Sequence, residues 1–582
     1  MPEPASFSLH MLDYIAFGAY FVVLCFIGFW VGRKEKTSPD EYFLAGRSLP
    51  WYVVGGSFIA SNISTEHFIG MIAAAYIYGI AVANLEWMNI VSFSLLVWFF
   101  IPFLLAARVF TTPEFLEKRF NSTLRQFFAV VTIIANIFAF LAAVLYGGGV
   151  ALEKLFGWNL WFAIIALGVV AGSWAIYGGL KSVAWTDFFT VIIMVAGGLM
   201  VTILGLYMLS GESHSLLDGF ETMLDRNRAT HGIWQQVVAQ NAEHIVGRET
   251  YNRLSVVQPV THAVYPWPLL VFGIFSISLW YNVLNQFMIQ RVLGAKDMYH
   301  ARMGIVFAGY MKILMPVIVV LPGLILFASN PELMQQPWDE IKTEADKGYV
   351  HLLQNLVPIG LRGLFLAALF GAIQSTVNSV LNSTSTVFTL DIYKRIFRPA
   401  ASEKHLVWVG VWSSVIILAL SILLAGFIKR FERGLFVYIH ELYCFFAPPF
   451  SAVFILGILF RRINAKGATV AVISGFILGI LMKVYLAIQP QYPALPELAW
   501  MRPYAMQGIL NWAFCTVLCV IISLLTPPPP PEQTTDQLVI NWRHLNIFTN
   551  LGRHWYTSVT LYWSLFAAII AALMLIFSGL IF

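Results

Sequence analysis

The chain has 582 residues, of which 59% are hydrophobic and only 11% are charged. Soluble domains carry about 25% charged residues, so this composition excludes an ordinary soluble protein and predicts an integral membrane protein. The formal net charge is +5, and the basic residues are spread over many short segments instead of one tract. We therefore expect a lipid bilayer around the chain and no nucleic acid as its partner.

Apolar stretches of about 18 to 25 residues, long enough to cross a bilayer as helices, follow one another along the chain. They predict an all-α membrane protein with about fourteen transmembrane helices. The predicted spans cover residues 12–32, 50–75, 80–106, 125–152, 158–178, 184–210, 267–289, 302–329, 361–389, 405–428, 435–459, 467–488, 505–526 and 555–581.

Lysine and arginine residues concentrate in every second loop between the predicted spans. Because cytoplasmic loops of membrane proteins carry an excess of these residues, we expect both termini on the outer, periplasmic or extracellular side. This orientation places the two long polar insertions, 211–266 and 330–360, outside together. The prediction is a multi-pass protein of the plasma (inner) membrane. Its basic inner loops are expected near residues 33–47, 108–119, 291–302, 394–404 and 461–466.

The second predicted span contains a polar segment where a membrane helix should be driest. Polar groups at this depth are tolerated only against protein or a water-filled cavity, and a helix broken here exposes carbonyl oxygens that can hold a cation. The alternative is a continuous helix whose small residues pack against a neighbouring helix. The segment holds Ser61, Asn62, Ser64, Thr65, Glu66 and His67.

The ninth predicted span carries a stripe of hydroxyl and amide side chains. Ser375, Ser379, Asn382 and Thr386 follow at spacings of four, three and four residues, which places them on one face of a helix. Neutral oxygen ligands suit a hard monovalent cation and carry too little charge to favour a divalent one. A stripe that faces the broken second span would complete an oxygen cage. Packing of small residues between helices is the alternative explanation.

A charged residue at the centre of a membrane helix costs about 2.5–3.5 kcal/mol, so each one within a predicted span needs a reason. Glu86 in the third span and Lys312 in the eighth can form a structural pair, or both can bind the hydroxyls of a polar solute. Asp187, near the inner start of the sixth span, could be an N-terminal capping charge. His440 is followed by Glu441 but lacks the second histidine of a zinc motif, so no metal enzyme is predicted.

The seventh predicted span mixes amide and hydroxyl side chains with aromatic rings. Amides hydrogen-bond sugar hydroxyls, and an aromatic ring offers a flat apolar surface to a pyranose. A contact between two helices would show a similar composition. The polar residues concerned are Ser276, Ser278, Tyr281, Asn282, Asn285 and Gln286.

Short motifs in a fixed order run over nearly the whole chain: Tyr42-Phe-Leu-Ala-Gly-Arg47, Ala60-Ser-Asn-Ile63, His67-Phe-Ile-Gly70, Glu86-Trp-Met88, Thr112-Pro-Glu-Phe115, Tyr177-Gly-Gly-Leu180, Trp185-Thr-Asp187, Asn285-Gln286, Gln290-Arg291, Val320-Leu-Pro-Gly323, Leu381-Asn-Ser-Thr384 and Phe388-Thr-Leu-Asp-Ile-Tyr-Lys394. Any one of them alone is weak, and their number and order make the set specific. Together they resemble the sodium/solute symporter family, and specifically its sodium–galactose and sodium–glucose cotransporter branch.

The resemblance implies a five-plus-five inverted-repeat transporter core whose first helix is discontinuous. One extra helix would precede this core and three would follow it. The implied divisions are an N-terminal helix with its inner loop (1–49), the first half of the core (50–210), an outer loop (211–266), the second half of the core (267–459, with the outer loop 330–360) and three additional helices (460–582) that include the linker Pro527–Pro531.

The resemblance also implies one sodium site between the second and ninth spans. Its ligands would be the backbone carbonyls of Ala60, Ile63 and Ala372 and the hydroxyls of Ser375 and Thr376. These positions fall on the same two spans that the residue pattern indicates. Asp187 matches a family acid that is linked to a sodium path on the inner side.

For a hexose, the resemblance implies a site of ten residues. His67, Glu86 and Lys312 would bind sugar hydroxyls, and Tyr281 would be the inner gate that stacks on the pyranose. The chain departs from the family at three of the ten positions: Ser278 and Asn282 stand where relatives often carry an amide or aromatic residue, and His440 where a glutamine is usual. The identity of the hexose therefore does not follow. The full set is Asn62, Ser64, His67, Glu86, Asn89, Ser278, Tyr281, Asn282, Lys312 and His440.

Residue patterns and resemblance together predict a sodium-coupled symporter that imports a galactose- or glucose-like monosaccharide by alternating access. Sodium is then a co-transported ion, and we expect no organic cofactor, no enzymatic activity and no obligate protein partner. Alternative solutes are myo-inositol, another polyol or sialic acid. From other classes, an intramembrane metal enzyme built on His67, His440 and Glu86 lacks ligand spacing, and a signalling sensor would need a relay domain for which the sequence offers no candidate.

Overall fold

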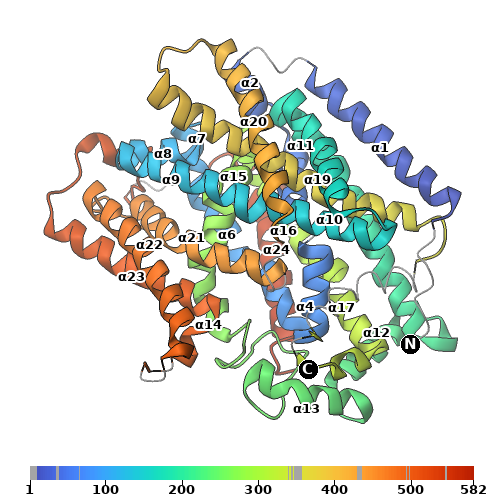
Figure 1. The fold of residues 1–582 in the computed structure, drawn as a ribbon. Coiled ribbons are helices and arrows are strands. Elements are labelled where there is room, and N and C mark those ends of the chain that lie inside the picture. Colours follow the sequence, from blue (N-terminus) through green and yellow to red (C-terminus); the bar gives the residue numbers. More distant parts are fainter. Residues whose placement is uncertain are drawn as a thin grey trace.

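The computed structural model describes residues 9–33, 38–64, 66–338, 340–341, 345, 357–428, 435–492, 495–496, 498–543 and 547–581. Within these ranges every regular element is a helix, and the backbone pairs as in a sheet only at a single bridge between Leu49 and Ala295. Figure 1 shows the helices packed side by side in one bundle. The prediction of an all-α fold is confirmed.

Twelve helical segments among the described residues are long and apolar enough to cross a membrane. The two longest are α11 (Leu160–Leu209), which would measure about 75 Å if straight against a hydrocarbon core of about 30 Å, and the 41-residue segment Glu66–Ala106. Each contains a glycine with positive φ, Gly179 in α11 and Gly79 in the segment Glu66–Ala106. A Cβ at Gly179 would lie 2.2 Å from the Tyr42 carbonyl oxygen, so only glycine fits there. Divided at these glycines, the segments overlap the fourteen predicted spans, and the short piece Glu66–Tyr78 covers the predicted span 50–75 only together with the helix Trp51–Asn62.

The helix predicted to be discontinuous is broken at the predicted place. Helix α3 (Trp51–Asn62) ends where Ile63 takes an extended conformation with φ −86° and ψ 123°. The chain resumes as the π-helical turn Glu66–Met71 and helix α4 (Ile72–Tyr78), and Thr65 lies outside the described residues. The alternative of one continuous helix packed through small residues is therefore wrong.

A second membrane helix is also broken, at a place that the sequence pattern did not predict. Helix α14 (Trp267–Gly273) continues through two π-helical turns, Ile274–Ser278 and Trp280–Leu284. Asn285 then takes φ −64° and ψ 123°, and helix α15 (Gln286–Leu293) follows. No proline or glycine marks this position, which is why the apolar pattern predicted one span over 267–289.

Helix α19 (Arg362–Val387) lies at the centre of the bundle. In its most apolar stretch 89% of the residues are buried, against 17% in the last helix, α24 (Val559–Ile576). Helix α19 packs against both α11 and α3, and α16 (Met298–Val319) packs against α3. The hydroxyl stripe of α19 is therefore enclosed by protein on the side of the helix break.

The remaining helices surround this centre (Figure 1). Helix α1 (Met11–Gly32) lies along α11 and α19, and its buried Asp13 carboxylate accepts hydrogen bonds from Gly360 N and Gly363 N at the start of α19, at 2.9 and 3.0 Å. The others are α2 (Pro39–Leu44), α5 (Asn84–Trp87), α6 (Asn89–Leu95), α7 (Ile101–Ala106), α8 (Thr112–Arg119), α9 (Ser122–Ala135), α10 (Ala142–Phe156), α17 (Leu321–Ser329), α20 (Glu403–Ala425), α21 (Leu435–Leu459), α22 (Ala465–Ile488) and α23 (Tyr504–Leu525).

The first long insertion folds into two surface helices, α12 (Leu216–Arg228) and α13 (Gly232–Val246). Its last part reaches the C-terminal end of the chain, where Val256 N donates to the Phe577 carbonyl at 2.7 Å. In Figure 1, α12, α13 and the C-terminus lie at the same end of the bundle. The second insertion, 330–360, falls largely outside the described residues.

Candidate cation site and solute cavity

The break in the first core helix brings backbone oxygens to one hydroxyl of α19. Thr376 Oγ1 lies 3.1 Å from the carbonyl oxygens of Ile63 and Ala372 and 3.4 Å from that of Ser61. A hydroxyl has one hydrogen to donate, so lone pairs on these carbonyls remain available to a further ligand. Ser375, one residue earlier on α19, is fully buried beside them.

The carbonyl of Ala60 is also left without its usual partner in the helix. An unbroken helix would supply the N–H of residue 64, but Ser64 N donates to His67 Nδ1 instead, at 3.3 Å. This carbonyl lies at the C-terminal end of α3, where the helix dipole favours positive charge. The five predicted sodium ligands thus belong to two facing segments and offer only neutral oxygens, as a hard monovalent cation requires.

A buried ion pair lies next to these oxygens. Asp187 Oδ2 accepts hydrogen bonds from Ser57 Oγ at 2.7 Å and from Ser61 Oγ at 3.2 Å. Arg291 NH2 lies 3.5 Å from the same oxygen, and its guanidinium also donates to Ser379 of α19. Asp187 lies two turns inside the second half of α11, so the interpretation of this residue as a helix cap is wrong. Arg291, expected in an inner loop, is wholly buried in α15.

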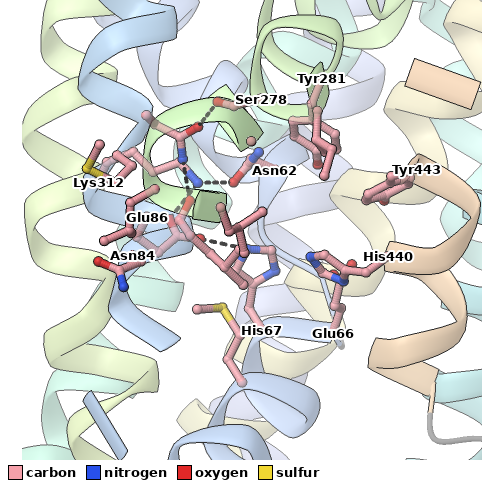
Figure 2. Close-up of a pocket in the computed structure, with 18 of the residues that line it drawn as sticks. Asn62, Glu66, His67, Asn84, Glu86, Ser278, Tyr281, Lys312, His440 and Tyr443 are labelled. Atoms are coloured by element: carbon pink, nitrogen blue, oxygen red, sulfur yellow. Dashed lines mark hydrogen bonds and ion pairs between the residues drawn. The ribbon is translucent and has the colours of Figure 1, made fainter. Parts of the chain in front are cut away.

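A cavity lies between the two broken helices. Its empty space, with the open mouth included, is about 910 Å³. Figure 2 shows its polar side chains converging from several helices. Eight of the ten predicted solute residues line it: Asn62, His67, Glu86, Asn89, Ser278, Tyr281, Lys312 and His440.

The other two predicted residues lie behind the cavity wall. Ser64 Oγ accepts a hydrogen bond from Glu66 N at 3.2 Å, across the helix break. Asn282 is fully buried, and its Nδ2 donates to Asn89 Oδ1 at 2.7 Å and to Ser92 Oγ at 3.0 Å. These two side chains therefore hold residues of the wall in position.

One side of the cavity carries a pair of opposite charges. Lys312 Nζ lies 2.5 Å from Glu86 Oε2 and also donates to the side-chain oxygen of Asn62. His67 Nε2 lies 3.4 Å from the second oxygen, Glu86 Oε1. Glu86 and Lys312 are only 3% and 2% exposed, and charges buried to this degree persist only when paired. Glu86 and Lys312 thus form a buried pair on the cavity wall, the first of the two alternatives that the sequence left open.

Aromatic rings close the cavity on the side of the second helix break. The ring centroid of Tyr281 lies 5.6 Å from that of Tyr443 and 6.3 Å from that of Phe140, and the Phe140 and Tyr443 rings stack at 4.9 Å. Phe287 of α15 packs edge-on against Tyr281 at 5.8 Å. A solute in the cavity would therefore meet a layer of rings between itself and α15.

Glu66, Tyr443 and Tyr504 are among the wall residues that the sequence did not predict. Glu66 Oε1 lies 3.2 Å from His440 Nδ1, and Tyr443 and Tyr504 line the cavity beside this pair. Glu66 stands in the polar segment of the second span, so the sequence held a usable signal for it. Tyr504 begins α23, one of the helices expected outside the core, and no sequence pattern connects it with the cavity.

Comparison with known proteins agrees with a symporter of this geometry. Residues 42–475 match the family model described as the sodium:solute symporter family. The chain belongs to this family. It is 36% identical over 486 residues to a sodium/glucose cotransporter of Vibrio parahaemolyticus, covering 82% of this chain and 86% of that protein. It is 33% identical over 486 residues to a sodium/myo-inositol cotransporter of Canis lupus familiaris, covering 81% of this chain and 66% of that protein. The resemblance stated from the motifs is confirmed.

A solved structure of a Na⁺-coupled sialic acid symporter, in a substrate-bound outward-open state, has a similar fold. It superposes with a TM-score of 0.69 at 21% identity, over 90% of this chain and 99% of that one. The likeness shows the fold alone and confirms the predicted symporter fold, a five-plus-five core with a discontinuous first helix. The family couples transport to sodium and needs no organic cofactor. In the described part of the chain, no three His, Cys, Asp or Glu side chains form a metal-binding group.

Proposed function

We propose that the protein is a sodium-coupled symporter that imports a neutral monosaccharide or a polyol of similar size. The observation that carries this proposal is that two consecutive residues, Asn62 and Ile63, belong to two different sites: the solute cavity and the cation site. The carbonyl of Ile63 lies 3.1 Å from Thr376 Oγ1 in the cation site. The side chain of Asn62 accepts a hydrogen bond from Lys312 on the cavity wall. If sodium stabilises one position of the helix break, Asn62 moves with Ile63, and the geometry of the solute site therefore changes too.

The proposed mechanism is a population shift between two arrangements of the broken helix. Sodium bound to the carbonyls of Ala60 and Ile63 and to the hydroxyl of Thr376 would hold α3 against α19. That contact would fix Asn62 and His67 in the geometry that binds solute, in an outward-open state. Sodium shifts this equilibrium only as far as its affinities for the two states differ. Release of sodium and solute would follow from the opposite state, by alternating access.

The ion gradient supplies enough free energy for concentrative uptake. One positive charge that moves down 100 mV releases about 2.3 kcal/mol. A tenfold sodium gradient adds about 1.4 kcal/mol. A single sodium ion per solute could therefore sustain an accumulation of roughly a few hundred-fold. The proposed ion path passes Asp187, whose carboxylate lies beside the oxygens of the cation site.

A neutral, hydroxyl-rich solute fits the cavity better than an anion. Its wall carries two carboxylates, Glu66 and Glu86, and one lysine, Lys312. A carboxylate-bearing solute such as sialic acid would meet net repulsion there unless a further proton were bound. The relatives described as sodium/glucose and sodium/myo-inositol cotransporters support a hexose or a cyclitol. Galactose and glucose remain our first choice and myo-inositol or another polyol the second.

The remaining expectations belong to the same proposal. We infer that the protein is not an enzyme, has no obligate protein partner and lies in the plasma (inner) membrane with both termini outside. The extra N-terminal segment (1–49), the two halves of the core (50–210 and 267–459), the outer loop (211–266) and the additional helices (460–582) are its proposed divisions. The outer loop and the C-terminal end support this orientation because they contact each other.

A thermal-shift screen of the purified protein tests the function. D-glucose, D-galactose, myo-inositol and N-acetylneuraminate are each added in sodium chloride and in potassium chloride. We expect a neutral sugar or polyol to raise the melting temperature in sodium only, since a ligand that binds the native state stabilises it. A shift of equal size in potassium would contradict sodium coupling, and a shift with N-acetylneuraminate alone would contradict the proposed solute class.

A further inference from the structure

Arg253 of the outer loop is a buried cation whose hydrogen-bond partners are neutral oxygens. Its residue is 1% exposed, and the five N–H groups of its guanidinium make five hydrogen bonds. The partners are the carbonyl oxygens of Ala75, Tyr76 and Ile77 at 3.3, 2.8 and 2.8 Å, Tyr251 OH at 3.1 Å and Asn227 Oδ1 at 3.3 Å. The guanidinium is therefore fixed in one orientation, toward the three carbonyls.

These three carbonyls lie at the C-terminal end of α4, in the outer half (66–78) of the broken first core helix. The last carbonyls of a helix lack partners within it, and the helix dipole favours a cation there. The loop backbone also reaches this end, because Ile80 N donates to the Arg253 carbonyl at 2.8 Å. A Cβ at Gly79 would lie 2.2 Å from the same carbonyl oxygen, so the close approach requires glycine. The outer loop thus caps α4 with both a side chain and backbone.

The same side chain joins α4 to two further helices. The guanidinium of Arg253 lies 3.7 Å from the ring centroid of Phe327 on α17. Asn227 of α12, which accepts the bond from Arg253 Nε, donates in turn to the Leu324 carbonyl of α17 at 3.0 Å. Helix α17 packs against both α4 and α12, and Figure 1 shows the three at the same end of the bundle. Around Arg253, therefore, α4, α12 and α17 form one unit.

The outer half of the broken helix also carries part of the cavity wall. His67 and Met71 line the cavity from the π-helical turn Glu66–Met71, which continues directly into α4. His67 lies about three helical turns from Ile77, whose carbonyl Arg253 binds. At the other end of this half, the extended backbone of Ile63 interrupts the helix, so α3 alone does not fix its orientation. The contacts at the Arg253 end therefore contribute to the position of His67.

We propose that Arg253 is a positioning residue for solute binding, which holds the outer half of the broken helix so that His67 faces the solute. This inference rests on the proposed function and deepens it. In the proposed mechanism sodium holds the inner half, α3, against α19, whereas Arg253 holds the outer half against α12 and α17. Solute affinity then depends on both contacts, and sodium affinity in the absence of solute depends on the first alone. The outer loop is thus part of the binding machinery.

The test compares Arg253→Lys with the unmodified protein, each as the purified full chain. Lysine keeps the positive charge but replaces the planar fork of five donors by one ammonium group with three. Tryptophan quenching gives the affinities for D-glucose and myo-inositol at saturating sodium, and the affinity for sodium without solute. We expect solute binding to weaken about tenfold, the equivalent of one lost hydrogen bond to a charged group. Sodium affinity should stay within about twofold, because the two sites share no contact with Arg253.

Uptake into proteoliposomes separates positioning from a loss of folded protein. Fewer folded molecules lower the maximal rate and leave KM unchanged, whereas a displaced outer half raises the KM for solute. We expect KM to rise about tenfold in Arg253→Lys. Tyr251→Phe is a milder variant that keeps the arginine and removes the hydroxyl that binds both Arg253 and the Ile77 carbonyl. Its KM should rise about threefold, the equivalent of one neutral hydrogen bond.

Arg226→Lys is the matched control, and its solute KM should not change. Arg226 is also an outer-loop arginine that donates to a helix-end carbonyl, that of Ala328 on α17 at 2.8 Å, and it stacks on Trp234 instead of reaching α4.

An unchanged solute KM in either Arg253→Lys or Tyr251→Phe, whichever folds, would overturn the inference, as would an equal rise in Arg226→Lys. A loss of sodium affinity as large as the loss of solute affinity would also overturn it. In each of these cases sodium-stimulated solute binding by the unmodified protein leaves the proposed function standing. Absence of sodium-stimulated binding of both probes by the unmodified protein overturns the two together.

Discussion

The cation site and the solute cavity lie on the two sides of one helix break, yet their chemistry is opposite. Around Thr376 the structure gathers neutral carbonyl and hydroxyl oxygens, and the nearest charges, Asp187 and Arg291, pair with each other. In the cavity, by contrast, carboxylates and a lysine line the wall and compensate one another. Neutral oxygens suit a charged ligand, and compensated charges suit a neutral ligand rich in hydroxyls.

Sodium and the solute are therefore expected to contact different side chains, while both sites depend on the same stretch of backbone at the helix break. Substitutions on α19 should therefore affect sodium first, and substitutions on the cavity wall should affect solute first. Coupling between the sites passes through Asn62 and Ile63, which follow one another in sequence. The predictions below test this division, beginning with the largest effect.

Removal of the hydroxyl ligands should abolish the response to sodium. In the double variant Ser375→Ala/Thr376→Ala each lost hydroxyl contact to a cation is worth about 1.5–3 kcal/mol. We expect the sodium concentration for half-maximal uptake to rise at least about 100-fold, measured in proteoliposomes. Ser383→Ala is the matched control, since this α19 hydroxyl donates only to the Val380 carbonyl of its own helix. Unchanged sodium dependence in the double variant would refute the assignment of the site.

Breaking the charge pair of the cavity should weaken solute binding more than sodium binding. Glu86→Gln and Lys312→Met each leave one buried charge without its partner, which costs about 3–5 kcal/mol. The combined variant removes both charges, so its melting temperature should recover toward that of the unmodified protein. Its solute affinity should not recover. Wild-type solute affinity in either single variant, by tryptophan-quenching titration, would make the pair purely structural.

Asp187→Asn should act on the ion path with a smaller effect. Without the carboxylate, the Arg291 guanidinium stays uncompensated beside the cation site and repels a passing sodium ion. We expect maximal uptake to fall about tenfold, while solute affinity at saturating sodium stays within about threefold of the original value. Asp13→Asn removes a buried carboxylate at the far end of α19 and serves as the control. Equal losses in both variants would show that Asp187 acts only through folding.

The sequence predicted the parts of this comparison that depend on polarity at membrane depth. A polar segment in the second span and a hydroxyl stripe in the ninth each violate the apolar pattern, so both were visible without coordinates. The pairing of Glu66 with His440 was not visible, because 374 positions separate them and nothing local links them. The break at Asn285 was missed since no helix-breaking residue stands there. Arg291 was mistaken for a loop charge because the boundary of its span is set by tertiary contacts.

A histidine outside the membrane-spanning segments gives the smallest predicted effect. Burial lowers the pKa of His262, in the outer loop, to about 3, and its Nδ1 accepts hydrogen bonds from Val264 N and Tyr265 N. Between pH 6.5 and pH 3 the unfolded chain binds a proton at this residue that the folded chain does not. The free energy of unfolding therefore decreases as the pH is lowered through that window. We expect a loss of about 2 kcal/mol from pH 7 to pH 5.

The variant His262→Gln tests this assignment. It should lower the acid sensitivity of the melting temperature and leave solute affinity unchanged, because His262 is not part of the cavity lining. Unchanged acid sensitivity in His262→Gln would contradict the role given to this residue.

The most direct test of sodium coupling through the helix break is a reciprocal binding measurement. Solute affinity is determined with and without sodium, and sodium affinity with and without solute, on the same purified protein. Because coupling free energy is mutual, we predict that each ligand tightens the other by the same factor, and that this factor falls to one in Ser375→Ala/Thr376→Ala. Solute affinity that is equal in sodium and potassium would contradict coupling between the two sites.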